Sequence, residues 1–263
     1  IRSDNKQIIK YKSNFFGNII RSLSNGNWVD IEKYYFKVLK SHFANYNLTN
    51  KKESVVNLNK EFDYLIFQLV EYIKEINKDI LSTPKLTADI TRSNFNEIFY
   101  STGIKIKVLN FNYTETLFLK NYVANDEIIS IHGRVGEIDI NPIIFGYGDE
   151  SDPAYQGLED SGENIYLEHI KSFGYFRTNN YNSLLSYIDS EPFKVYILGH
   201  SCGLSDRVLL NEIFEHTNCK NIEIFYHKKK DGTDNFKEIT QEISRHFKPY
   251  NKNIMRRRII NKN

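Results

Sequence analysis

Short β-branched apolar runs alternate with helical stretches from residue 104 onward, and this alternation constrains the fold more than any other feature. The run Ile104-Lys-Ile-Lys-Val-Leu109 alternates apolar and polar residues, as a half-buried strand does. Four further apolar runs are predicted as strands, at residues 128–131, 143–145, 195–198 and 222–225. Helical stretches separate several of them, at residues 115–122, 184–188, 206–216 and 236–247. This order predicts an α/β fold with a mostly parallel sheet flanked by helices.

The first third of the chain has the pattern of amphipathic helices. From Phe62 onward, apolar residues recur at steps of three and four, namely Leu65, Ile66, Leu69, Ile73, Ile76 and Ile80. An earlier helix is predicted to begin near Asp30 and is joined to the long one by the polar residues 47–52. Its inward-facing residues are Ile31, Tyr35, Val38 and Leu39. The long helix should end at Thr83, because Pro84 disfavours helical geometry in the residue before it.

These patterns divide the chain into three predicted parts. They are a helical N-terminal portion at residues 1–93, an α/β core at 94–250 and a basic C-terminal tail at 251–263. Residues 146–162 are rich in Gly, Asp, Glu and Ser and are predicted as a long surface loop. The basic residues Met255-Arg-Arg-Arg258 are interpreted as a solvated end in preference to a nucleic-acid arm. Whether the helical portion is a separate domain or a lid stays open.

Composition narrows the range of partners and compartments. The formal net charge is only +2, so global charge does not favour nucleic acid or membranes. No apolar run approaches the roughly 20 residues that a membrane-spanning helix needs. The two cysteines, Cys202 and Cys219, lack the spacing of a metal site or a disulfide framework. A reduced, cytoplasmic compartment is therefore expected.

Polar residues follow the first two predicted strands, where open α/β sheets bind ligands. Asn112 and Thr114 lie just ahead of Glu115, where an amide can position a ribose hydroxyl or a water, although both residues also suit a helix N-cap. His132 and Gly133 follow the second strand, and His132 can serve either as a general base or as a structural histidine. No ligand-spaced partners surround His132, so no metal is expected.

A third set of small and polar residues follows the strand at residues 195–198. Gly199 allows the backbone to approach a ligand, and Ser201 offers a hydroxyl and an amide at a helix start. Asp206 can cap that helix or bind a ribose. Residues 199–203 also match the G-x-S-x-G nucleophile elbow of α/β-hydrolases.

The hydrolase hypothesis needs an acid and a histidine after Ser201 in the chain. Asp231 and His246 nominally fill these roles. The remaining chain is too short for the usual later strands, and no HGGG-type oxyanion loop precedes the serine. A serine hydrolase is therefore disfavoured.

Four segments together resemble the AbiH family of bacterial abortive-infection proteins, which act in phage defence. They are Trp28-Val-Asp-Ile-Glu32, Phe111-Asn-Tyr-Thr-Glu-Thr116, Ile131-His-Gly133 and Gly199-His-Ser-Cys-Gly-Leu-Ser-Asp206. Their order and spacing fit that family over most of the chain. The family in turn resembles sirtuin-like domains, which bind NAD in a Rossmann-type sheet. The resemblance therefore implies a Rossmann-like, sirtuin-like fold.

The resemblance also implies roles for individual residues. Asn112 would orient the nicotinamide ribose or an attacking water, and His132 would be the general base. The implied nucleotide contacts are Thr114, Glu115, Gly133, Gly199, Ser201 and Asp206. The implied reaction is hydrolysis of the nicotinamide–ribose bond of NAD, which needs a positioned water, a base and exclusion of bulk solvent. Deacetylation is less expected, because the Cys-x-x-Cys zinc module of deacetylating sirtuins is absent.

The family and the sirtuins open with a strand and a Gly-rich phosphate-binding turn, which this chain lacks. Gly17 in Phe-Phe-Gly-Asn is not such a turn, so we expect the turn to precede residue 1. The helical portion could supply Trp28, Asp30 or Glu32 to the site.

The expected partners are a nucleotide ligand, a phage trigger protein and further copies of the chain in a homo-oligomer. The alternative hypothesis is a non-catalytic nucleotide-binding or protein-interaction module, in which the same polar residues cap helices.

Overall fold

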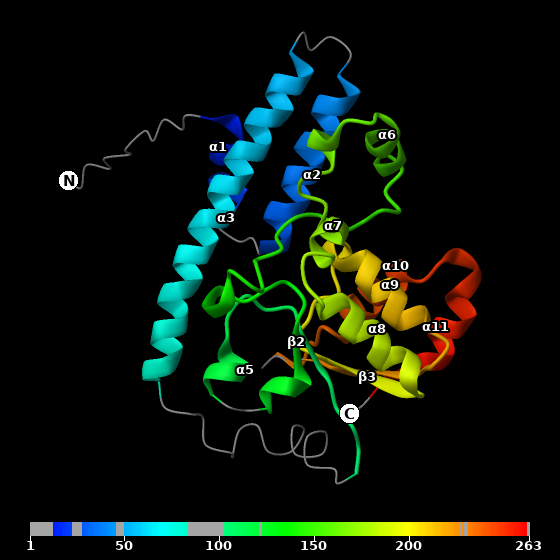
Figure 1. Ribbon diagram of the computed structural model, residues 1–263. Coiled ribbons are helices and arrows are strands. Elements are labelled where there is room, and N and C mark those ends of the chain that lie inside the picture. The colour runs from blue at the N-terminus through cyan, green and yellow to red at the C-terminus, as the bar shows by residue number, and fades with distance from the viewer. Residues whose placement is uncertain are drawn as a thin grey trace, which may run out of the picture.

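The protein has a mixed α/β fold in which helices flank two small parallel sheets, as a computed structural model shows (Figure 1). The structure describes residues 13–22, 28–45, 50–83, 103–120, 123–226, 228 and 231–261. The expected boundary between residues 93 and 94 lies outside the described residues. The described chain opens with three helices, α1 (Asn14–Ser22), α2 (Trp28–Ala44) and α3 (Lys51–Ser82).

The helical pattern of the first third is confirmed, but α3 begins about three turns earlier than predicted. It starts at Lys51 instead of Phe62, because Val55 and Leu58 extend the buried stripe toward the N-terminus. The polar residues Asn57, Asn59 and Lys60 on either side of Leu58 hide this stripe in the sequence. The helix ends at Ser82, with an extended Thr83 as its C-cap, as the following proline predicts.

Two parallel sheets take the place of the single sheet that was expected. In the first, β1 (Val108–Asn110) pairs with β2 (Ile128–Ser130). In the second, β4 (Cys219–Phe225) lies between β3 (Phe193–Leu198) and β5 (Ile259–Asn261). Residues 104–107 were predicted as strand but lie outside the sheet, because β2 offers a partner to only three residues of β1.

Shorter helices connect and cover the strands. They are α5 (Thr116–Leu119), α6 (Tyr155–Asp160), α7 (Lys171–Tyr175), α8 (Asn180–Ser190), α9 (Arg207–Glu215), α10 (Phe236–His246) and α11 (Lys252–Arg258). Single 3₁₀ turns add η1 (Asn125–Glu127), η2 (Val135–Glu137), η3 (Asn164–Tyr166), η4 (Leu204–Asp206) and η5 (Pro249–Asn251). Helices α8 to α11 gather around β3, on the side of the molecule away from α3 (Figure 1). None of the described helices is long and apolar enough to cross a bilayer.

The predicted strand at residues 143–145 is wrong. This segment is buried but joins neither sheet, because it runs between two hydrophobic cores. Ile143 and Phe145 pack into the first core, whereas Ile144 between them packs into the second. Residues 143–145 therefore have the apolar composition of a buried strand but do not pair with any strand of the two sheets.

The two cores divide the chain differently from the predicted parts. The first combines α1, α2 and α3 with residues from the segment 135–170. The second combines β2, β3, β4 and the helices α8 to α10. The N-terminal helices thus share a core with a segment that lies about 50 residues beyond them in the sequence.

Two segments expected to be solvated are in fact structured. The start of the predicted surface loop, residues 146–149, is buried, because Gly146 and Gly148 let the backbone press against the carbonyl groups of His169 and Ser205. The C-terminal residues form α11 and β5, and the Arg258 guanidinium donates a hydrogen bond to the Phe214 carbonyl at 2.6 Å. These residues are therefore part of the fold, although Arg256 and Arg257 are exposed to solvent.

Candidate functional site

A half-open cavity of about 690 Å³ lies where the predicted strand ends and α2 meet. Its volume is in the range of small-molecule sites. Six of the eight residues predicted as site residues line it, and these are Asn112, Thr114, His132, Gly199, Ser201 and Asp206. The expected convergence of three strand ends on one cleft is therefore present in the structure.

The other two predicted residues, Glu115 and Gly133, are absent from the lining of this cavity. Glu115 is buried, accepts hydrogen bonds from Asn77 and Arg134, and ties α3 to the segment after β2. Gly133 has a φ of 87°, and a Cβ there would lie 2.1 Å from the Pro142 carbonyl oxygen. The hydrogen bonds of Glu115 and the tight backbone packing at Gly133 explain why these residue types occur there without a ligand.

The turn after β1 leaves Asn112 open to the cavity. The side chain of Asn110, the last residue of β1, accepts a hydrogen bond from the Asn112 N–H and donates one to its carbonyl. These two hydrogen bonds fix the backbone of Asn112. Its exposed side chain forms no hydrogen bond among the described residues. Helix α5 begins only at Thr116, with Glu115 as its N-cap and no side-chain cap. Neither Asn112 nor Thr114 therefore serves as the helix cap that was the alternative for them.

Three buried charged side chains form the floor of the cavity. Lys171, the first residue of α7, donates to Glu32 on α2 at 3.1 Å and to Asp206 before α9 at 2.8 Å. Glu32 also accepts hydrogen bonds from the Gly146 N–H at 3.3 Å and the Tyr113 hydroxyl at 3.4 Å. Buried charges are tolerated only when they are paired in this way.

His132 lies beside this charged floor with its ring almost fully buried. Nδ1 lies 3.2 Å from the Phe111 carbonyl oxygen, which can only accept, so Nδ1 carries a proton. Nε2 lies 3.0 Å from Asp206 Oδ1, within reach of its charge but out of alignment for a hydrogen bond. The ring also stacks on Tyr113, with centroids 5.6 Å apart. The only basic nitrogen of the neutral ring is therefore Nε2.

Burial and the shared lysine shift the protonation of these groups in opposite directions. Desolvation, opposed by Lys171, raises the pKa of Glu32 to about 7. Although burial acts against it, the adjacent Lys171 and His132 hold the pKa of Asp206 well below its usual value. Desolvation and the lysine charge lower the pKa of His132. The floor at neutral pH thus holds an ionised Asp206, a charged Lys171 and a neutral His132, with Glu32 close to its midpoint.

The loop after β3 combines an exposed serine with a strained cysteine. Ser201 is exposed on the cavity, whereas Cys202 is buried and has a φ of 55°, which is uncommon for a residue other than glycine. The Cys202 N–H donates to His200 Nδ1 at 3.0 Å, and its carbonyl faces His246 Nε2 at 2.7 Å. Strained backbone of this kind is concentrated at functional sites.

This geometry does not make a nucleophile elbow. In an elbow the serine itself occupies the strained turn, but here the left-handed residue is Cys202. His246, the histidine that the hydrolase hypothesis needs, hydrogen-bonds the Cys202 carbonyl, and burial lowers its pKa to about 4. Asp231 is exposed and hydrogen-bonds Thr233 instead. The groups that would activate Ser201 are therefore engaged elsewhere.

Sequence reasoning missed Lys171 and left the roles of α2 undecided. The residues around Lys171 match no sequence motif, so nothing local predicts a functional role for it. Asp30 and Glu32 do line the cavity, as one of the two hypotheses for α2 expected. Trp28 begins α2, but its side chain lies outside what the structure describes. Asp206 precedes α9 without capping it, because its carboxylate binds Lys171 instead.

Comparison with protein-family models gives a match. The family model for bacteriophage abortive infection AbiH matches residues 1–228, which is most of the chain. A search of curated proteins and a search of solved structures found no match.

Proposed function

The chain belongs to the AbiH family of bacteriophage abortive-infection proteins, and from this premise we propose that its cavity binds NAD or a related nucleotide and hydrolyses the nicotinamide–ribose bond. Family membership implies a role in phage defence. The observation that carries the finer proposal is the convergence of Asn112, His132 and Ser201 on one cavity. A Rossmann-like, sirtuin-like fold is part of the same proposal.

The proposed reaction breaks the bond between ribose C1′ and the nicotinamide nitrogen while water adds at C1′. The Asn112 side chain is open to the cavity and can orient the ribose or the water. His132 is neutral and can take the proton of the water on Nε2. Asp206, 3.0 Å from that nitrogen, would stabilise the imidazolium that forms. Glu32, with a pKa of about 7, offers a second group that can exchange a proton near neutral pH.

The rim of the cavity supplies groups suited to the rest of a dinucleotide. Lys33 and Arg245 line it and are cations able to bind phosphate. Gly199 and Ser201 are exposed and line the same cavity, so backbone and hydroxyl can contact ribose or phosphate. Gly17 lies within α1, so it does not form the phosphate-binding turn.

The alternative is a non-catalytic nucleotide-binding module, and one observation favours it. Both ring nitrogens of His132 face protein oxygens, at Phe111 and Asp206, and its side chain is only 4% exposed. A histidine held in this way can simply shape the cavity.

Incubation of the full-length protein with NAD, followed by chromatographic detection of free nicotinamide, tests the proposal. Wild type should release nicotinamide, and Asn112→Ala and His132→Ala should each lower the rate by about 10²-fold or more, as expected for removal of an acid–base or positioning group. Because His132 is buried, His132→Gln and the melting temperature of each variant check the fold. His216→Ala, whose ring pairs with Asp189 away from the cavity, is the matched control.

Two results separate the hypotheses. Nucleotide binding without release of nicotinamide would favour the non-catalytic module. Nicotinamide release that survives in both cavity variants would place the reaction elsewhere.

A further inference from the structure

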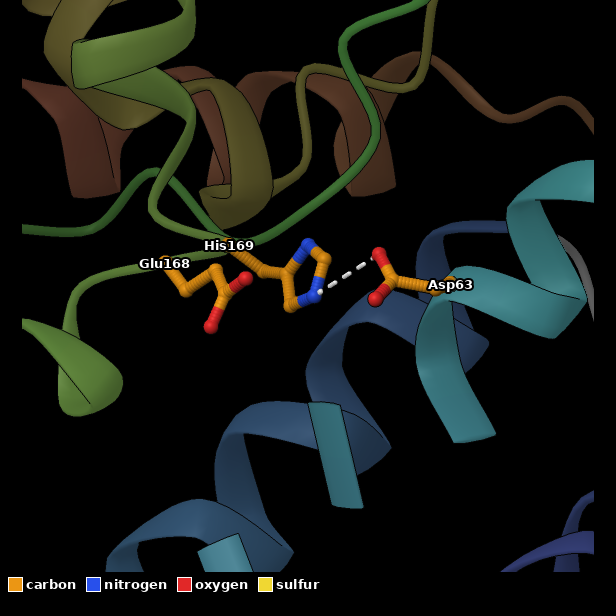
Figure 2. A group of neighbouring side chains, drawn as sticks. All are labelled: Asp63, Glu168 and His169. Carbon is orange, nitrogen blue, oxygen red and sulfur yellow. Dashed lines mark ion pairs between the residues drawn. The ribbon is translucent and has the colours of Figure 1, made fainter. Parts of the chain in front are cut away.

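A second polar cluster lies on the surface between α3 and the turn that precedes α7. It consists of Asp63 on α3 with Glu168 and His169 on the turn (Figure 2). One donor atom from each residue lies within 4.8 Å of the other two. The cluster shares no residue with the cavity described above.

The His169 ring points into this cluster and lacks a hydrogen bond on the side that faces it. Its side chain is 8% exposed, and Nε2 lies 3.4 Å from Asp63 Oδ1 without hydrogen-bonding geometry (Figure 2). Nε2 is therefore a buried ring nitrogen that lacks a hydrogen bond among the described residues. A buried polar nitrogen without a hydrogen bond costs free energy, and so it calls for a ligand or an explanation.

Neighbouring residues hold Glu168 and His169 in place. The Asn59 amide donates to Glu168 Oε2 at 2.9 Å, and the Tyr35 hydroxyl in turn donates to Asn59 Oδ1 at 2.7 Å. The His169 ring packs edge-on against Phe62, with centroids 4.9 Å apart. Outer hydrogen bonds and ring packing of this kind orient the ligands of metal sites.

We propose that Asp63, Glu168 and His169 form a site for a divalent transition-metal ion such as Zn²⁺. One imidazole and two carboxylates are a donor set that such ions bind, and two carboxylates balance the charge of the ion. Mg²⁺ should bind less well, because imidazole is a poorer ligand for it than oxygen.

Only a small movement is needed to close the site. Donors at about 2.1 Å from a tetrahedral Zn²⁺ lie roughly 3.4 Å apart, which is less than the separation of 4.8 Å within which the free donors lie. Asp63 and Glu168 are both exposed, and because Asn59 already orients Glu168, the Asp63 carboxylate is the one that can rotate inward without disturbing the core. Their exposure also leaves a coordination position for water.

The bound ion would join α3 to the turn that leads to Lys171 of the cavity floor. Asp63 belongs to the N-terminal helices, while His169 lies two residues before Lys171. The His169 backbone is already fixed, since its carbonyl accepts a hydrogen bond from the Tyr147 N–H at 3.1 Å. A metal at this site would therefore clamp α3 to the turn that delivers Lys171.

Calorimetric titration of the chelator-treated full chain with ZnCl₂ tests the proposal. Wild type should bind one ion per chain, and Asp63→Asn and Glu168→Gln should each weaken binding by at least about tenfold. Both substitutions keep the size of an exposed side chain, so the fold should persist. Glu75→Gln, at a 70% exposed carboxylate on the same helix, is the matched control and should bind like wild type.

Two further measurements make the result decisive. Zn²⁺ should raise the melting temperature of wild type by more than Mg²⁺ does, and it should leave that of Asp63→Asn nearly unchanged. Co²⁺ should give a visible absorption band that His169→Asn loses. The proposal is overturned if wild type binds no Zn²⁺, or if both carboxylate variants bind it as tightly as wild type.

Discussion

Lys171 is the residue on which the cavity floor depends, because it lies between two carboxylates and all three side chains are buried. Its ammonium group lies 3.0 Å from Glu32 and 2.8 Å from Asp206. Although burial alone would lower the pKa of Lys171, the two carboxylates raise it, so the lysine stays charged. Removing one member of such a group leaves an uncompensated charge in the interior, which costs more than the intact pairing contributes.

Lys171→Met should therefore destabilise the protein strongly. We expect the free energy of unfolding to fall by about 3–5 kcal/mol, measured by urea denaturation at pH 7.5. Lys40→Met is the control, because Lys40 pairs with Asp152 near the surface, where a salt bridge contributes about 1 kcal/mol or less. Equal losses of unfolding free energy in the two variants would mean that the buried cluster contributes no more to stability than a surface salt bridge does.

Individual site residues were predicted from their position after strands and not from their contacts. That rule located Asn112, His132 and Ser201, because they follow strands whose ends meet. It missed Lys171, whose partners lie 139 and 35 residues away in the chain. It also gave Gly133 a ligand role, although the sequence does not reveal that the Pro142 carbonyl occupies the space a Cβ would need.

Among the helices and strands, β5 is the case in which strand pairing differs most from what the local sequence predicts. Residues 259–261 follow three arginines and read as a charged end, yet they pair with β4 in parallel register. Ile259 also packs against the second core. Without β5, the outer edge of β4 would expose unpaired N–H and carbonyl groups, and such edges promote association.

Ending the chain after Arg258 should therefore lower the free energy of unfolding and promote self-association. The loss of three ladder pairs and of Ile259 packing should cost roughly 1–3 kcal/mol in urea denaturation. Light scattering coupled to gel filtration measures the association. A chain that lacks only residues 262–263 is the control, and indistinguishable behaviour of the two truncations would refute a structural role for β5.

Element prediction succeeded for strands and helices of the second core and failed for the segment that runs between the two cores. The helices α9 and α10 match their predicted segments closely, whereas β3, β4 and α8 contain their predicted segments but begin earlier. The segment 143–145 failed because its alternate side chains enter different cores, which no local pattern distinguishes from a buried strand. The division into two sheets could not be predicted from local sequence patterns, because it depends on which strands pair with one another in the folded chain.

For the molecule as a whole, acid sensitivity follows from histidines that are buried in neutral form. Burial lowers the pKa of His246 to about 4, while the unfolded chain binds a proton near 6.5. Between these values the unfolded state takes up a proton that the folded state cannot, so stability is lost as the pH falls from 6.5 toward 4. The gap corresponds to about 3 kcal/mol for this residue.

His246→Gln should flatten this dependence. We expect wild type to lose about 3 kcal/mol more than the variant between pH 7.5 and 4, from urea denaturation at each pH. Glutamine can still donate to the Cys202 carbonyl, and comparison at pH 7.5 isolates any packing effect. Parallel pH profiles of wild type and variant would contradict the assignment.

The origin of the cavity floor in distant parts of the chain has a consequence for biosynthesis. A ribosome must add 139 residues after Glu32 before Lys171 exists, and 35 more before Asp206 does. Closing loops of this length comes after local helices have formed, since long-range contacts are entropically costly. Whatever chemistry the cavity performs therefore begins only once most of the chain has been translated, and no partly synthesised fragment ending before Asp206 can carry it out.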